Sequence, residues 1–307
     1  MMMSAPADLD RTDEDDFGDS DLENAPEEHF AQHIADAQHV KADLESVADS
    51  QKQLNSFQQG ELLEALKKLE DLFQRNLGTW PNAEMGATLI GGTTPCHCQK
   101  PMRTPHAHHG ALKKEIDRLV STGVPEEADG NTAGTWCSPS FVTDMNKKDG
   151  TVRFITDCKE VNRRIARKPW PMPHTADLSQ DIGRHFCLPA LALSMDCCHF
   201  KSDNKLQDMS AFVLPWGLCK HLQPPMGLSI SPDLFQANMQ MLLADLPFVK
   251  VHLDDVLIFC NGSHQDHMKK VKQVLERLRS KNSAVNARKS FWAVKEAYHL
   301  GFMLTPK

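Results

Sequence analysis

The stretch VKVHLDDVLIF, residues 249–259, places two adjacent carboxylates, Asp254 and Asp255, inside a run of apolar residues. Residues 249–253 and 256–259 each have the length and the apolar content of a strand, and Asp is a favoured turn residue. The pattern therefore predicts a hairpin with both carboxylates at its turn, where they either close the hairpin in water or bind a cation. The flanking strands are apolar on both faces, which favours a covered sheet and a turn in a defined place.

A third carboxylate, Asp196, ends the apolar segment LPALALSMD. Three carboxylates brought together repel one another unless a cation compensates them. Magnesium is the expected cation, with manganese as an alternative, because it prefers oxygen ligands and leaves positions open for phosphate oxygens. Two such ions activate an attacking hydroxyl and stabilise a leaving pyrophosphate. With Lys148 and Arg153 to neutralise a triphosphate, the residues predict nucleotidyl transfer, and Asp196, Asp254 and Asp255 are the predicted catalytic metal ligands.

Hydrophobic periodicity predicts helices over residues 62–78, 111–122 and 268–278. Ser231 and Pro232 are the predicted N-cap and first-turn proline of another helix. The segment SPSFVTDMNKKDGTVRFITD contains two strand-like runs joined through Asp-Gly, which predicts either a functional basic hairpin or an ordinary charged turn. Strands and helices without strict alternation predict an α+β fold, an antiparallel sheet backed by helices.

Charge is distributed unevenly along the chain. The formal net charge is −7, but the first 50 residues are much more acidic than the rest. The first 50 residues contain fifteen Asp and Glu against Arg11 and Lys41. The rest of the chain is mildly basic, as in a folded domain that meets polyanions, although a merely solubilising leader explains the charge equally well. We expect a mostly disordered leader at 1–60, a linker helix and extended lead-in at 61–110, and the main domain at 111–307.

Cysteine usage favours a reducing compartment, because nine cysteines without paired spacing do not form a secreted disulfide framework. Cys96, Cys98 and the nearby histidines lack a second ligand pair at the spacing of a closed zinc site, so we do not predict zinc there. The sequence has neither an apolar run of membrane-spanning length nor a signal peptide. We expect an intracellular protein, in the cytoplasm, a virus-like particle or the nucleus.

Ordered motifs over residues 63–307 resemble the reverse transcriptase of Ty3/gypsy-type retrotransposon polyproteins. The matching segments are the fingers hairpin with KKDGTVRFITDCKEVN, the strand LSMD, the pocket motif VLPWG with PPMGLSISPDLFQ, the hairpin VHLDDVLIF and the strand motif HLGFM. The resemblance implies the fingers and palm of a right-hand polymerase. It also implies magnesium-dependent addition of deoxynucleoside triphosphates to a primer 3′-hydroxyl on an RNA or DNA template.

The resemblance assigns roles to individual residues. It places Lys148 and Arg153 on the incoming triphosphate, with Asp157 beside the site. Met226, Gly227 and Phe235 match the template and nucleotide pocket, and Asp196, Asp254 and Asp255 match the catalytic aspartates. The implied primer grip consists of Leu300, Gly301 and Phe302.

The chain departs from the family pattern at several positions. His252 replaces the tyrosine before the Asp-Asp pair, and the Gly-Tyr step that excludes ribonucleotides is missing after Asp196. Tyr298 is the chain's single tyrosine, so Phe200 is the candidate sugar gate if the shorter loop repositions it. The pocket arm reads Gln-Pro-Pro-Met-Gly at residues 223–227. The sequence ends at Lys307, where the family's thumb, connection and RNase H domains would follow.

These departures leave three hypotheses. The chain is an active, poorly processive RNA-directed DNA polymerase, a degenerate retroelement remnant without turnover, or a non-catalytic nucleic-acid-binding module that uses its basic hairpin. Its oligomeric state does not follow from the sequence.

Overall fold

The computed structural model describes residues 42–74, 79–81, 83–98, 100–128, 136–142, 152–173, 189–193, 199–260, 263–292, 297–299 and 302–304. Lys41–Lys307 form one compact unit. Within the described ranges, no helix is long and apolar enough to cross a membrane.

A four-stranded antiparallel sheet with strand order β11-β5-β10-β9 forms the palm-like part. Its strands are β5 (Ala190–Leu193), β9 (Val249–His252), β10 (Asp255–Ile258) and β11 (Val285–Phe291). Alternation gives each strand two faces: Leu191, Leu193, Val256 and Ile258 enter the main core, whereas Ala190 and Leu257 belong to a separate small cluster. The predicted α+β fold is therefore confirmed, but the two faces of this sheet are packed differently.

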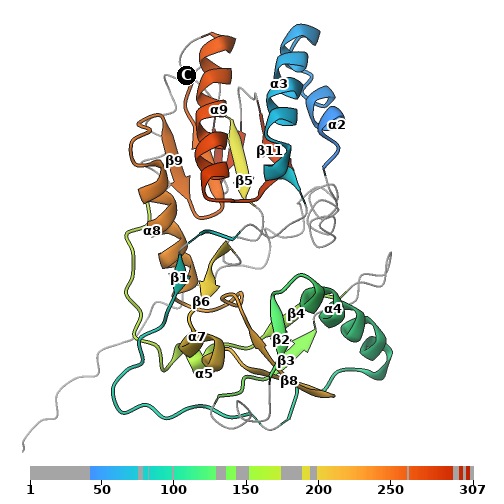
Figure 1. Cartoon of the computed structure of the whole chain (residues 1–307), viewed down its shortest axis with the longest axis vertical. Coiled ribbons are helices and arrows are strands. Elements are labelled where there is room, and N and C mark those ends of the chain that lie inside the picture. The colour runs from blue at the N-terminus through green and yellow to red at the C-terminus, as the bar shows by residue number, and fades with distance from the viewer. Residues whose placement is uncertain are drawn as a thin grey trace, which may run out of the picture. The chain divides into compact units, whose positions relative to one another are not determined.

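Helices α8 (Ser231–Leu243) and α9 (His264–Ser280) lie in the same part of the molecule as this sheet (Figure 1). Their buried apolar residues belong to the main core. Helix α9 begins where the Ser263 side chain accepts a hydrogen bond from the Asp266 amide. The predicted cap of α8 is wrong by one residue, because Ile230 occupies the N-cap position and Ser231 is already helical. The helix start has no side-chain cap, and Pro232, which lacks an amide hydrogen, lies in the first turn.

Two N-terminal helices, α2 (Leu44–Asp49) and α3 (Ser56–Lys68), pack on the palm elements and are followed by η1 (Glu70–Phe73). A capping box starts α3, since Asn55 and Gln58 each bond the other's backbone amide. Leu44 and Val47 are buried in the main core, so the folded unit includes part of the segment that composition assigned to the leader. The Arg279–Asp71 ion pair at 2.7 Å and a 3.1 Å contact between His264 Nε2 and Glu61 Oε2 join these segments to α9.

The fingers-like part contains the predicted hairpin and a second sheet. Strands β3 (Ser140–Val142) and β4 (Phe154–Thr156) pair antiparallel, and a three-stranded sheet has the order β2-β8-β7. The latter strands are β2 (Pro125–Glu127), β7 (Phe212–Leu214) and β8 (Gly217–His221). Helix α4 (His109–Ser121) lies against β2 and β4 (Figure 1). Its residues Leu112 and Ile116 share a buried cluster with Phe212 and Leu214.

Short elements complete the described chain. They are β1 (Glu84–Met85), η2 (His106–His108), α5 (Lys159–Asn162), β6 (Lys201–Ser202), α7 (Asn204–Met209), β12 (Ala297–His299) and β13 (Phe302–Leu304). Strand β1 pairs parallel with β6, and the Asp203 amide donates to the Met85 carbonyl at 2.9 Å. A Cβ atom at Gly86 would lie 2.4 Å from Asp203 Oδ2, so a larger residue there would displace the Asp203 side chain. Across the described residues, no group of three or more His, Cys, Asp or Glu is arranged to hold a metal ion.

Leu66 tests whether the N-terminal helices belong to the folded unit. Its side chain is 0% exposed, so Leu66→Ala should lower the free energy of unfolding by about 3 kcal/mol through lost burial and a cavity. Urea denaturation followed by circular dichroism measures the loss. Phe57→Ala in the same helix is the control, because Phe57 is 74% exposed and its change should stay within about 0.5 kcal/mol. Equal losses in the two variants would contradict this packing.

His221 gives the stability a pH dependence. Burial lowers its pKa to about 3 in the folded chain, against about 6.5 in an unfolded chain. Between these values the unfolded state binds the extra proton, so the free energy of unfolding falls as pH drops, by up to about 1.4 kcal/mol per pH unit. We expect His221→Gln to flatten denaturation midpoints measured from pH 7 to 4, whereas His106→Gln, at an exposed position, keeps the original slope. An unchanged slope in the first variant would refute the assignment.

Candidate active site

The two adjacent aspartates lie at the β9–β10 connection, as the sequence predicts, but they occupy different positions. Asp255 is the first residue of β10 and pairs with His252, whereas Asp254 lies in the two-residue turn. The Asp254 carbonyl accepts a hydrogen bond from the Leu193 amide at 2.8 Å. The end of β5 is thereby fixed beside the carboxylate turn.

Strand register places four residues in one row across the sheet: Asn286, Ala192, Asp255 and His252. Directly paired residues project to the same face, so Asp255 shares its face with these neighbours and not with the helices. Ala192 is small and leaves space beside the carboxylate. The neighbouring β11 edge is irregular: Ser290 Oγ accepts from the Ala192 amide at 3.1 Å and donates to the Asn286 carbonyl at 2.7 Å.

The turn residue Leu253 has a φ of 51°, a left-handed conformation that a leucine rarely adopts. Gln236, which is 0% exposed in α8, supports this conformation. Its side-chain oxygen accepts from the Leu253 amide at 2.6 Å, and its side-chain nitrogen donates to the Val251 carbonyl at 2.9 Å. Backbone strain of this kind persists when the surroundings over-determine it, and Gln236 supplies that support.

Burial raises the pKa of both carboxyl groups. For Asp255, burial and then repulsion from Asp254 raise the pKa to about 6. Burial also raises the pKa of Asp254, and a backbone hydrogen bond and then the nearby His252 partly offset that rise. Two partly buried, mutually repelling oxygen donors fit a divalent cation, which would remove the repulsion and favour the ionised forms.

A second group of predicted residues comes together around the loop before α8. Arg153 Nη2 lies 4.0 Å from the sulfur of Met226, whose side chain is 55% exposed. Gly227 follows with a φ of 91°, which favours glycine. Asn162 holds this loop, since its amide donates to the Gly227 carbonyl at 2.8 Å and its oxygen accepts from the Ser229 amide at 2.9 Å. An exposed guanidinium therefore lies beside an exposed thioether on a loop of fixed conformation.

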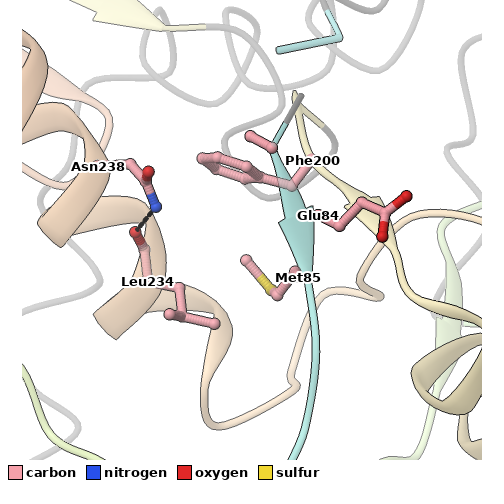
Figure 2. A pocket seen from close by; sticks show the side chains of 6 residues that line it. Glu84, Met85, Phe200, Leu234 and Asn238 are labelled. Atoms are coloured by element: carbon pink, nitrogen blue, oxygen red, sulfur yellow. Dashed lines mark hydrogen bonds between the residues drawn. The ribbon is translucent and has the colours of Figure 1, made fainter. Parts of the chain in front are cut away.

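Phe200 is 2% exposed, and its ring packs on Trp80 and Phe235 with centroid distances of 5.2 and 6.0 Å. It lines a pocket of about 270 Å³ together with Met85, Leu234 and other residues of β1 and α8. Figure 2 shows these side chains around the pocket, with the Glu84 carboxylate pointing away from them. Phe235 is likewise a core residue, at 1% exposed.

Two further predicted residues, Asp157 and Phe302, lie in described segments, and four others do not. Asp157 accepts from the Lys159 amide at 3.0 Å, just before α5. Phe302 begins β13, which pairs with β12. Asp196, Lys148, Leu300 and Gly301 lie outside the described residues.

Comparison with known proteins decides the family. The model of the family described as "Reverse transcriptase (RNA-dependent DNA polymerase)" matches residues 145–304, more than half of the chain. The chain belongs to the reverse transcriptase family. The prediction of a retrotransposon-type reverse transcriptase is thus confirmed, and the family to which the chain belongs is that of RNA-directed DNA polymerases.

Curated relatives include the Transposon Tf2-7 and Tf2-3 polyproteins of Schizosaccharomyces pombe. Each is 24% identical over 280 residues, which cover 89% of this chain and 20% of the relative. The chain therefore spans about a fifth of the length of the curated relatives it matches.

Solved structures with the same fold include the foamy viral protease-reverse transcriptase. Its complex with double-stranded DNA has a TM-score of 0.75 at 22% identity, covering 86% of this chain and 45% of that chain. Its complex with an RNA/DNA hybrid also has a TM-score of 0.75, at 21% identity, covering 87% and 36%. Reverse transcriptases use divalent metal ions, consistent with the carboxylate pair in this chain.

Sequence reasoning missed three polar residues of this reverse transcriptase domain that support the site: Gln236, Asn162 and Asp233. Asp233 is 3% exposed and accepts from Arg167 Nε at 2.7 Å and from the Trp170 amide at 3.1 Å. The available signal was a polar residue inside an otherwise apolar helical segment, SPDLFQANM. Lys289 on β11 was also missed, and burial lowers the pKa of its amine.

Gln236→Leu tests the support of the turn. The variant removes both hydrogen bonds to the hairpin, so the strained Leu253 conformation should lose occupancy and polymerase turnover should fall by about tenfold or more. Primer extension measures turnover, and circular dichroism checks that the fold is retained. Gln273→Leu on the exposed side of α9 is the matched control and should leave turnover unchanged. Full turnover in a folded Gln236→Leu variant would disprove this role.

Proposed function

We propose that this chain catalyses magnesium-dependent addition of deoxynucleotides to a primer 3′-hydroxyl on an RNA or DNA template. The observation that carries the proposal is the half-buried pair Asp254 and Asp255, kept on a strained turn by Gln236. A hairpin that only reversed the chain in water would need neither the strain nor the buried support. The comparisons support the reaction through the family, and the foamy viral complexes support a nucleic-acid partner.

Asp254 and Asp255, with Asp196 as the third ligand, would hold two magnesium ions, or manganese in their place. When bound, such ions lower the pKa of the attacking hydroxyl and neutralise charge on the departing pyrophosphate. The exposed Arg153 guanidinium, together with Lys148, would bind the triphosphate and orient it. Met226 and Gly227 would border the nucleotide, with the loop conformation fixed by Asn162.

Leu300, Gly301 and Phe302 are the proposed primer grip, and the protein is proposed to act inside the cell, in the cytoplasm, a virus-like particle or the nucleus. These assignments rest on the motif order in the sequence, which includes the HLGFM segment.

Primer extension on poly(rA)/oligo(dT) with magnesium tests the reaction. Asp254→Asn and Asp255→Asn keep the side-chain shape and remove a charge, so each should lower incorporation by about 100-fold or more. Asp208→Asn, at an exposed position on α7, is the matched control and should incorporate normally.

The same assay separates the alternatives. Incorporation that survives both active-site substitutions would refute the assigned residues. A wild-type chain that binds the duplex with salt-sensitive affinity but incorporates nothing would be a binding module. Absence of both activities would identify a degenerate remnant.

A further inference from the structure

Strand β11 does not pair regularly with its neighbour in the palm-like sheet. Its register with β5 passes from Asn286 opposite Ala192 to Phe291 opposite Ala190, so β11 advances five residues while β5 advances two. The additional residues form a bulge, which interrupts the backbone hydrogen bonds between the two strands. Backbone groups of β5 that face the bulge therefore need other partners.

A serine hydroxyl takes the place of one interrupted backbone bond. Ser290 is 4% exposed, and its Oγ accepts a hydrogen bond from the Ala192 amide at 3.1 Å. The same hydroxyl donates to the Asn286 carbonyl at 2.7 Å. One buried side chain therefore connects the start of the bulge to its end, and connects both to β5.

Two further side chains fix the shape of the bulge. Asn286 Oδ1 accepts from the amides of Arg288 and Lys289, each at 3.1 Å, which folds the chain back on itself within the bulge. The indole nitrogen of Trp292, a residue that is 0% exposed, donates to the Ala287 carbonyl at 3.2 Å. Because these contacts hold the bulge in one conformation, the serine hydroxyl is presented to β5 at a fixed place.

Consecutive amides at the end of β5 point to opposite edges of that strand. The Ala192 amide reaches Ser290 on β11, whereas the Leu193 amide donates to the Asp254 carbonyl at 2.8 Å. Ala192 also pairs with Asp255 on β10. The hydroxyl on β11 thus holds the strand that is bonded to the carboxylate turn and lies beside its second carboxylate.

We propose that Ser290 is a positioning residue for the carboxylate turn. Gln236 supports this turn from helix α8, and Ser290 supports it from the opposite edge of the sheet through β5. Without the hydroxyl, the Ala192 amide loses its acceptor, and the end of β5 shifts relative to Asp254. The inference rests on the proposed function, because a displaced turn affects the reaction only if its carboxylates hold the reacting metal ions.

Hydrogen exchange in the chain without metal or nucleic acid tests the contact itself. Ser290→Ala removes the acceptor, so the Ala192 and Leu193 amides should exchange about tenfold faster relative to the amides of α9. Ser280→Ala is the matched control and should change neither rate. Its hydroxyl also donates to a backbone carbonyl, that of Arg277 at 2.6 Å, but lies at the exposed end of α9. Unchanged exchange in Ser290→Ala would overturn the inference.

Primer extension on poly(rA)/oligo(dT) separates a positioning role from a purely structural one. In Ser290→Ala, displacement of the turn should lower kcat about tenfold and raise the magnesium concentration that gives half the maximal rate. KM for dTTP should stay within about threefold of wild type, because Arg153 and Met226 lie by a separate loop held by Asn162. A rise in KM with unchanged kcat would contradict the assigned role.

Two conservative variants separate hydrogen bonding from stability. Ser290→Thr restores the hydroxyl, so its kcat should lie within about threefold of wild type even if the added methyl group lowers the denaturation midpoint. Ser290→Cys is close to serine in size but is a weaker acceptor, so its kcat should lie between those of wild type and Ser290→Ala. It also replaces the alanine variant if that one does not fold. Values of kcat that follow stability and not hydrogen-bonding capacity would refute the positioning role.

Failure of this inference and failure of the proposed function give different results. A wild-type chain that extends no primer refutes the polymerase function, and the exchange rates then decide alone whether Ser290 holds the turn. A wild-type chain that extends primers, together with a folded Ser290→Ala variant of equal kcat, refutes the inference and leaves the function in place.

Discussion

Two hydrogen bonds between Gln236 and the hairpin backbone hold the carboxylate turn, and the rest of the site depends on them. Gln236 is fully buried, so its amide must find partners inside the protein. The Leu253 amide donates to the Gln236 side-chain oxygen, and the Val251 carbonyl accepts from the Gln236 side-chain nitrogen. If the turn relaxed, the glutamine would be left unsatisfied at a cost of about 1–3 kcal/mol, which is comparable to the strain at Leu253. The helix and the turn therefore stabilise each other.

Helix α8 connects this turn to the other residues of the site. Near its start, Asp233 binds Arg167 and the Trp170 amide, which fixes the extended segment around residues 167–170 along the helix. The loop that precedes the helix carries Met226 and Gly227, and Asn162 sets its conformation. Partners more than 60 positions apart in sequence are thereby joined at one helix and its preceding loop, so the residues proposed to bind triphosphate and metal have a common support.

Successive side chains along each strand of the palm sheet project to opposite faces, so one face packs in the core and the other carries Asp255. Leu191, Leu193, Val256 and Ile258 face the helices and anchor the sheet, whereas Ala192 and His252 flank Asp255 on the other face. The small alanine leaves room beside the carboxylate, and partial burial of Asp255 raises its pKa. A divalent cation at this position would offset the repulsion between the two carboxylates.

The sequence alone determined the hairpin, the strand that precedes Asp196 and the α+β class, because apolar periodicity and Asp turn preferences are local properties that one chain segment contains in full. The family was indicated by the resemblance of its ordered motifs. The sequence also identified Arg153 and Met226 as pocket residues, and in the structure Arg153 Nη2 lies 4.0 Å from the Met226 sulfur. The tertiary structure alone decided the roles of Gln236, Asn162 and Asp233, and it placed Phe200 in the core. Whether a buried amide supports a turn, or a ring packs inside or faces a ligand, depends on partners distant in sequence, and local patterns contain no information about those partners.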